Sequence, residues 1–135
     1  MSDRSLDYPF QRLREVRKAL LNLHKALLES EKIVYEKKHG RIQSKGEFFR
    51  LVVDHEWFGW LRPISQFIVK IDEALGGKEP ATLNEVKGLL SEAKVLLHPA
   101  ESGTAAEQRY YQAIQRDPNV AFMHSQIAEV LNPEV

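Results

Sequence analysis

The sequence predicts an all-α protein, folded as an antiparallel helical bundle of four to five helices. Apolar residues recur at alternating three- and four-residue spacings, as they do on the buried face of a helix. Ser-x-x-Glu or Thr-x-x-Glu sequences at Ser44, Thr82 and Thr104 are typical of helix N-termini. The chain has 135 residues and no cysteine. We therefore expect a single helical-bundle domain over 1–135 that needs no disulfide to support its core.

The first helix is predicted to run from Pro9 to just before Gly40. Proline suits the first turn of a helix, and glycine suits a left-handed C-terminal cap. Residues 1–8 are expected to form a flexible N-terminus. An apolar seam contains Leu13, Val16, Leu20, Leu23, Leu27 and Val34. A second row beside it contains Phe10, Arg17, Leu21, His24, Leu28, Glu31 and Tyr35. So wide a face is expected to contact two neighbouring helices.

The second helix is predicted to begin at Ser44, where Glu47 completes a capping box, and to stop at Gly76. Pro63 lies within it and removes one backbone donor, which predicts a kink near Gly59. The first two helices have similar lengths. We expect them to form a long antiparallel hairpin over residues 9–75.

Shorter helices are predicted after Thr82. The first of these ends before Pro99, and another begins at Thr104. Beyond Thr104 the apolar face shifts by more than 90° around the helix axis, so one straight helix cannot bury all of it. Asp117 and Pro118 form a good cap and first-turn pair. Two helices are therefore expected there, over residues 104–116 and 118–131.

The charge balance argues against polyanionic partners. Nineteen basic residues offset nineteen acidic ones, so the chain lacks the basic surplus of a nucleic-acid binder or a membrane-surface protein. No apolar run approaches the length of a membrane span, and the N-terminus lacks the apolar region of a signal peptide. We expect a soluble, cytoplasmic protein that binds neither nucleic acid nor membrane and needs no cofactor.

Glu56 is the candidate for a buried acid. If the second helix is continuous, Glu56 falls on an aromatic and aliphatic stripe with Phe49, Val53, Trp60, Ile64, Phe67 and Ile71. A carboxylate on such a stripe needs an ion-pair partner, a proton or a ligand. The residues of a candidate ligand pocket are Glu56, Trp57, Trp60, His24 and His124.

Catalytic and metal-binding patterns are weak. The single Glu-x-x-His sequence, from Glu36 to His39, lies at a helix end beside two lysines, whereas di-iron bundles use this motif twice. Cysteine is absent, and neither a nucleophile elbow nor a phosphate-binding loop is present. We therefore predict no catalytic residue and no metal site.

A second apolar face is predicted on the second helix, and it is the candidate interface. Its residues are Phe48, Leu51, His55, Phe58, Arg62 and Val69. Either another helix of the same bundle covers this face, or it forms a homodimer interface, for which aromatic residues and arginine are typical.

Three functions are open from the sequence. The first is a non-catalytic helical protein that acts through self-association or through binding another helical protein. The second is a bundle that binds a small ligand or a metal near Glu56, Trp57 and Trp60. The third is an enzyme that uses Glu56 with a histidine as acid and base.

Overall fold

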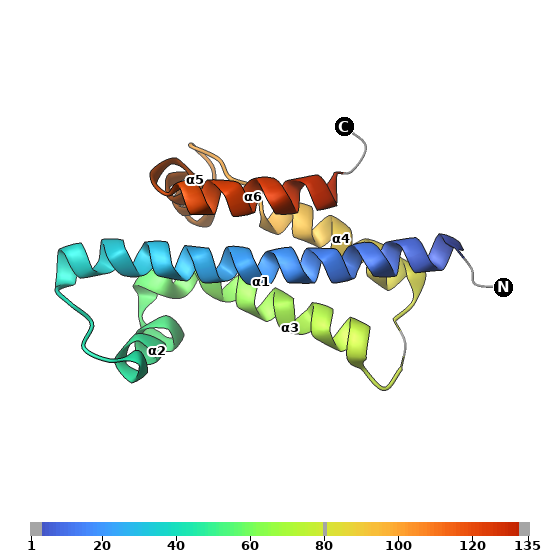
Figure 1. The fold of residues 1–135 in the computed structure, drawn as a ribbon, viewed down its shortest axis with the longest axis horizontal. Coiled ribbons are helices and arrows are strands. Elements are labelled where there is room, and N and C mark those ends of the chain that lie inside the picture. The colour runs from blue at the N-terminus through green and yellow to red at the C-terminus, as the bar shows by residue number, and fades with distance from the viewer. Residues whose placement is uncertain (1–3, 80, 133–135) are drawn as a thin grey trace.

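Helices make up the whole described architecture (Figure 1). The computed structural model describes residues 4–79 and 81–132. The elements are α1 (Arg4–His39), α2 (Lys45–Asp54), the 3-10 helix η1 (Glu56–Leu61), α3 (Arg62–Gly76), α4 (Leu83–Leu96), α5 (Ala105–Arg116) and α6 (Pro118–Leu131). The predicted all-α class is confirmed. The described part of the chain has six α-helices, more than the four to five predicted, and no strand.

Helix α1 begins earlier than predicted and ends where predicted. It starts at Arg4, so residues 4–8 of the expected flexible N-terminus lie in the helix, while residues 1–3 lie outside the described residues. Gly40 has a φ of +89°, and its amide donates to the Glu36 carbonyl over 2.9 Å. Glycine adopts this backbone conformation without a steric penalty, which explains the sharp end of the helix.

Helix α1 is the central element of the fold. It contacts α3, α6, η1, α4 and α5. In Figure 1, α3 lies on one side of α1 and runs in the opposite direction, and α6 lies on the other side. Five residues of the predicted seam are fully buried, namely Leu13, Val16, Leu20, Leu23 and Leu27, and Val34 is half-buried.

The predicted single kinked helix over 45–75 is instead two α-helices joined by η1. His55 has an extended backbone with φ −80° and ψ 136°, which no residue inside a helix adopts. Its amide ends α2 by donating to the Leu51 carbonyl over 2.8 Å, and its side-chain Nδ1 accepts from the Trp57 amide over 3.0 Å. Pro63 lies in the first turn of α3, where its missing N–H breaks no helical hydrogen bond. The break is therefore at His55, and Pro63 helps to start the next helix.

The three predicted capping sequences all begin helices, but only one forms both hydrogen bonds of a capping box. Thr104 Oγ1 accepts from the Glu107 amide over 3.2 Å, and Glu107 Oε1 accepts from the Thr104 amide over 2.8 Å. Hydrogen bonding by Thr104, first of all by its backbone amide, lowers the pKa of the Glu107 carboxyl. Ser44 and Thr82 accept from the N3 amide of their helices without the reciprocal bond.

The predicted division of the last segment is confirmed. Helix α5 ends at Arg116, and α6 starts at Pro118. The Asp117 side chain caps α6 by accepting from the Asn119 amide over 2.9 Å. This turn lets Tyr110 and Val120 both point into the core, although the two residues would lie on different faces of a continuous helix.

One apolar core joins α1, η1, α3, α4, α5 and α6. Its largest fully buried side chain is Phe58 of η1. Helix α2 alone among the α-helices of the described chain contributes no buried residue. Figure 1 shows α2 set apart at one end of α1, on the side away from α5 and α6. Within the described ranges, no helix combines the length and the apolar composition needed to cross a membrane.

Candidate functional site

The buried acid of this fold is Glu31, not Glu56. Glu31 is 1% exposed, whereas Glu56 lies exposed in the first turn of η1. The expectation for Glu56 assumed a continuous helix, and the extended backbone at His55 turns Glu56 away from the core. Glu31 lies on the second row of α1, which already combined apolar and polar residues in the sequence.

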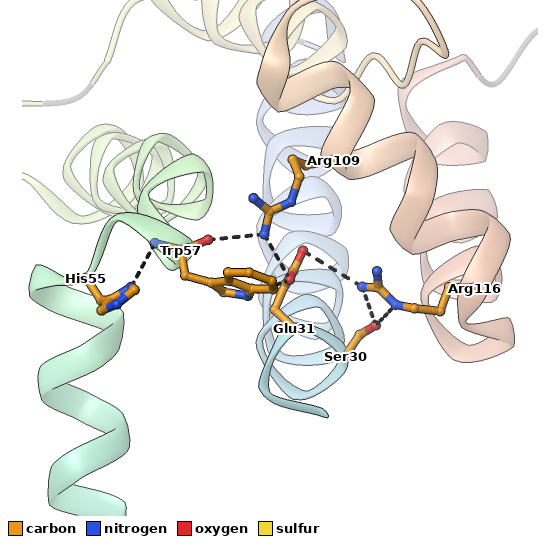
Figure 2. A network of polar contacts seen from close by, with 6 residues as sticks. All are labelled: Ser30, Glu31, His55, Trp57, Arg109 and Arg116. Atoms are coloured by element: carbon orange, nitrogen blue, oxygen red, sulfur yellow. Dashed lines mark hydrogen bonds and ion pairs between the residues drawn. The ribbon is translucent and has the colours of Figure 1, made fainter. Parts of the chain in front are cut away.

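Glu31 is surrounded by donors from two other elements (Figure 2). Its Oε2 accepts a hydrogen bond from Trp57 Nε1 over 3.0 Å and another from Arg109 Nη2 over 3.1 Å. The same Arg109 nitrogen donates to the Trp57 carbonyl over 3.2 Å. One carboxylate of α1 therefore holds both η1 and α5.

A second arginine of α5 completes the network. Arg116 Nη2 lies 3.8 Å from Glu31 Oε1, and Arg116 Nε and Nη2 both donate to the hydroxyl of buried Ser30, over 3.2 and 2.9 Å (Figure 2). Within the described structure, Glu31 Oε1 has no hydrogen-bond donor at bonding distance. The negative charge thus lies between two guanidinium groups, which compensates for much of the cost of removing it from water.

Aromatic rings enclose this network. The Arg109 guanidinium carbon lies 4.9 Å from the Trp57 ring centre and 5.8 Å from that of Trp60, and Lys38 Nζ lies 5.3 Å from the Trp57 ring centre. Such cation–π contacts strengthen as water is excluded. Trp57 and Trp60 therefore meet at Arg109 and not at Glu56. Arg109 was not among the predicted pocket residues.

The chemistry available to Glu31 is that of a structural ion pair. An acid or base in catalysis needs a route to a substrate, whereas both oxygens of Glu31 face protein groups in a site that is 1% exposed. The only sequence signal for Glu31 is its position on the same row of the helix as Leu28 and Tyr35. No sequence signal pairs it with Arg109, 78 residues away.

The two predicted pocket histidines lie in different places. Tyr110 packs between Trp60 and His124, with ring-centre distances of 6.5 and 5.3 Å, and its hydroxyl lies 2.6 Å from His124 Nδ1. Burial raises the pKa of the Tyr110 phenol and lowers the pKa of the His124 imidazole, so the uncharged forms of both are favoured. A neutral imidazole can accept the hydroxyl hydrogen at Nδ1.

His24 lines a separate cavity between α1, α2, η1 and α3. Its volume is about 240 Å³. The cavity is lined by His24, Val52, Val53, Phe58, Leu61, Arg62, Ser65 and Gln66, and the two tryptophans of the predicted pocket do not belong to its lining. Burial lowers the pKa of the His24 imidazole as well. Arg62 spans one side of the cavity by donating to the carbonyls of Val52 and His55, over 3.4 and 2.8 Å.

The lowered pKa of His124 predicts a loss of stability in mild acid. Unfolding exposes the ring, whose pKa then returns to about 6.5. As the pH falls through that value, the unfolded chain binds the proton before the folded chain does, so the free energy of unfolding decreases until the pH passes below the folded pKa. His124→Gln removes this proton and keeps an acceptor for Tyr110. We expect it to flatten the decrease in stability between about pH 7.5 and pH 5.5, measured by urea denaturation.

The matched control for that measurement is His98→Gln, because His98 is exposed. It should leave the pH dependence of the wild type unchanged. Equal slopes for the two variants would contradict a half-buried His124 that folding keeps neutral.

The predicted interface residues do not form one surface. Phe58 is 0% exposed and belongs to the core, because η1 points it between α1 and α2. Phe48, Leu51, His55 and Arg62 are half-buried, and Val69 is exposed on α3. Phe58 is therefore covered within the chain, as one of the two alternatives from the sequence proposed.

The outer surface of α2 carries the residues that were predicted to be core. Phe49 is 69% exposed and Val53 is 49% exposed. The inner surface of α2, with Phe48 and Leu51, is half-buried against the core through Phe58, whose ring centre lies 5.7 Å from that of Phe48. The face of α2 that was expected to be buried is exposed, and the other face packs inward. The reason is the extended backbone at His55, which interrupts the helix so that Phe49 and Trp60 no longer lie on one face.

Glu36 and His39, the single Glu-x-x-His pair, have separate local contacts. Glu36 Oε2 accepts from the Ile42 amide over 2.9 Å, and the His39 ring stacks on Tyr35 at 4.5 Å between centres. Within the described residues, no group of three or more His, Asp or Glu side chains is arranged to hold a metal ion.

Comparisons of the chain with protein-family models, curated proteins and solved structures found no match.

Proposed function

We propose that the protein is a non-catalytic helical module that acts through self-association, with α2 as its contact surface. The observation that carries this proposal is that α2, whose sequence is KGEFFRLVVD, buries none of its residues. Five of its ten residues carry apolar side chains, and two of these, Phe49 and Val53, are exposed on the outer surface.

Helix α2 is short, and a short helix depends on packing for its stability. Isolated helices shorter than about 12 residues are marginal in water, and most helical stability in proteins comes from packing an apolar face. Helix α2 has 10 residues, and the element that it chiefly contacts is η1. A second chain on the outer surface would supply the packing that α2 lacks within its own chain.

The composition of the outer surface supports an interface. Fully burying a phenylalanine or valine side chain is favourable by roughly 1.5 to 3 kcal/mol, so exposing both on one helix forfeits stabilisation that a partner would recover. Arg50 lies beside Phe49, and aromatic residues with arginine are typical of interface centres. The buried Glu31 carboxylate bonds to protein donors, and the half-buried His124 and His24 lie in separate places, which supports a role without catalysis.

The test is the mass of the protein in solution. Sedimentation velocity at micromolar concentrations should give twice the chain mass for the wild type, and Phe49→Ser should return the protein to the mass of one chain. The matched control is Phe122→Ser, because Phe122 is 56% exposed on α6 and should leave the dimer intact. A wild-type monomer at every concentration tested, or equal effects of the two substitutions, would overturn the proposal.

A further inference from the structure

We infer that α2 is a lid over the cavity that contains His24, and that this lid opens and closes while the other helices stay folded. The lid lies between two buried anchors, one in the loop before α2 and the other in η1. This inference goes beyond the proposed self-association. It concerns the inner surface of α2 and the cavity beneath it, whereas association uses the outer surface.

Both ends of the lid are held in place. Before α2, Ile42 is buried, and its amide donates to the Glu36 carboxylate over 2.9 Å. After α2, Phe58 of η1 is fully buried in the core. Between these anchors α2 buries no residue, and the extended backbone of His55 separates it from η1. A helix attached in this way can move as one unit, because the rotation takes place at His55 and in the loop before α2.

A few modest contacts hold the lid closed. Arg62 of α3 donates to the carbonyls of Val52 and His55 at the C-terminal end of α2, over 3.4 and 2.8 Å. On the inner surface of α2, the Phe48 ring centre lies 5.7 Å from that of Phe58. Each such contact contributes little by itself, whereas each of the other α-helices buries apolar side chains. Opening α2 therefore costs less free energy than unfolding the bundle.

The lid covers an imidazole that burial keeps neutral. His24 of α1 lines the cavity of about 240 Å³ together with Val52 and Val53 of α2. The residues one turn from His24 on α1 are all leucines, and Arg62 is the one charged side chain among the described residues that line the cavity. Burial lowers the pKa of the His24 imidazole. Opening removes the α2 side of the cavity, so water reaches the ring and reverses this effect.

Acid is therefore expected to favour the open lid. The pKa of His24 is lowered while the lid is closed and returns toward the ordinary histidine value of about 6.5 when it is open. As the pH falls through that value, the open form binds the proton before the closed form does. The equilibrium then shifts toward the open form, by at most about tenfold per pH unit for one imidazole.

Native-state hydrogen exchange tests the lid. It is measured on the Phe49→Ser chain, so that association through the outer surface of α2 does not contribute. We expect the amides inside α2 to be at least about a hundredfold less protected than those in the middle of α1. Their exchange should depend weakly on urea, because opening exposes little surface, whereas α1 amides should follow global unfolding. Equal protection and equal urea dependence in α1 and α2 would overturn the inference.

Two arginines with the same kind of contact provide a matched comparison. Arg12 donates to the carbonyls of Val130 and Leu131 at the end of α6, over 3.0 and 2.9 Å, as Arg62 does at the end of α2. Arg62→Gln should speed the exchange of α2 amides about tenfold and leave the middle of α1 unchanged. Arg12→Gln should leave α2 exchange unchanged. Equal effects of the two substitutions on α2 would contradict a lid held by Arg62.

Phe48→Ala is the second variant, and it tests the lid without changing Arg62. It removes the ring contact with Phe58, so it should also speed the exchange of α2 amides relative to those of α1. An unchanged ratio of α2 to α1 protection would contradict a lid that closes through its inner surface.

His24→Gln tests the effect of acid. Between about pH 7.5 and pH 5.5, the opening of α2, corrected for the intrinsic exchange rate, should increase in the Phe49→Ser chain. The same chain with His24→Gln should show a clearly smaller increase, because it lacks the imidazole that the lid covers. Equal increases in the two chains would overturn the placement of the lid over His24.

The lid and the proposed self-association fail separately. A wild-type chain that sediments as a monomer would overturn self-association and leave the lid standing. Protection of α2 equal to that of α1 in the Phe49→Ser chain would overturn the lid and leave self-association standing.

Discussion

Replacing Phe58 with alanine is expected to lower the free energy of unfolding by about 3 to 5 kcal/mol, the usual effect of removing a buried aromatic side chain. Phe58 is 0% exposed, and its ring lies 5.7 Å from the ring centres of both Tyr35 and Phe48. Its removal leaves a cavity where α1, α2 and η1 meet. Urea denaturation followed by tryptophan fluorescence measures the effect, because both tryptophans lie in η1.

Two comparisons make the Phe58 result specific. Phe122→Ala removes the same atoms from a side chain that is 56% exposed and should change stability by less than about 1 kcal/mol. Phe49→Ser should weaken association without unfolding the chain, whereas Phe58→Ala should weaken the fold. A stable Phe58→Ala protein that has lost only its ability to dimerise would contradict the core position and return Phe58 to an interface.

Replacing Glu31 with alanine is expected to lower the free energy of unfolding by about 2 to 4 kcal/mol. Breaking a buried ion pair commonly costs about 3 to 5 kcal/mol. The lower range applies here because the side chains of Arg109 and Arg116 are 31% and 34% exposed, so water can solvate them once the carboxylate is gone. Trp57 Nε1 also loses its acceptor.

Glutamine at position 31 separates charge from hydrogen bonding. Glu31→Gln keeps an oxygen that can accept from Trp57 but removes the charge, so its effect on stability should lie between those of the wild type and Glu31→Ala. The control is Glu29→Ala, an exposed position on the same helix, with an expected change within about 0.5 kcal/mol. An effect of Glu31→Ala as small as that of Glu29→Ala would contradict the network.

The sequence predicted part of the polar network and missed the rest. Trp57 was selected, and it does belong to the polar network, but its partners were not found. The sequence placed the buried acid at Glu56, because in an unbroken helix Glu56 lies two turns from Phe49 on the same face. Residues that meet across 78 positions, such as Glu31 and Arg109, leave no local pattern in a single sequence.

Local chemistry determined the helices themselves. Four helices have the N-cap that the sequence predicts, namely Ser44, Thr82, Thr104 and Asp117. Gly40 adopts the left-handed conformation that ends α1. These features depend on a side chain and the few backbone groups beside it. They can therefore be predicted from short stretches of sequence.

Only the tertiary structure decided which faces are buried after His55. The sequence between Ser44 and Gly76 has helical spacing throughout, and no proline or glycine marks position 55. The side chain of His55 accepts from the Trp57 amide, while Phe58 and Leu61 enter the core from η1. A 3-10 helix turns by about 120° per residue, so η1 and the extended residue before it reset the helical phase. The sequence by itself thus determined an all-α chain and most helix ends, whereas packing of η1 against α1 decided that Phe58 is core, Glu56 is exposed and Phe49 faces outward.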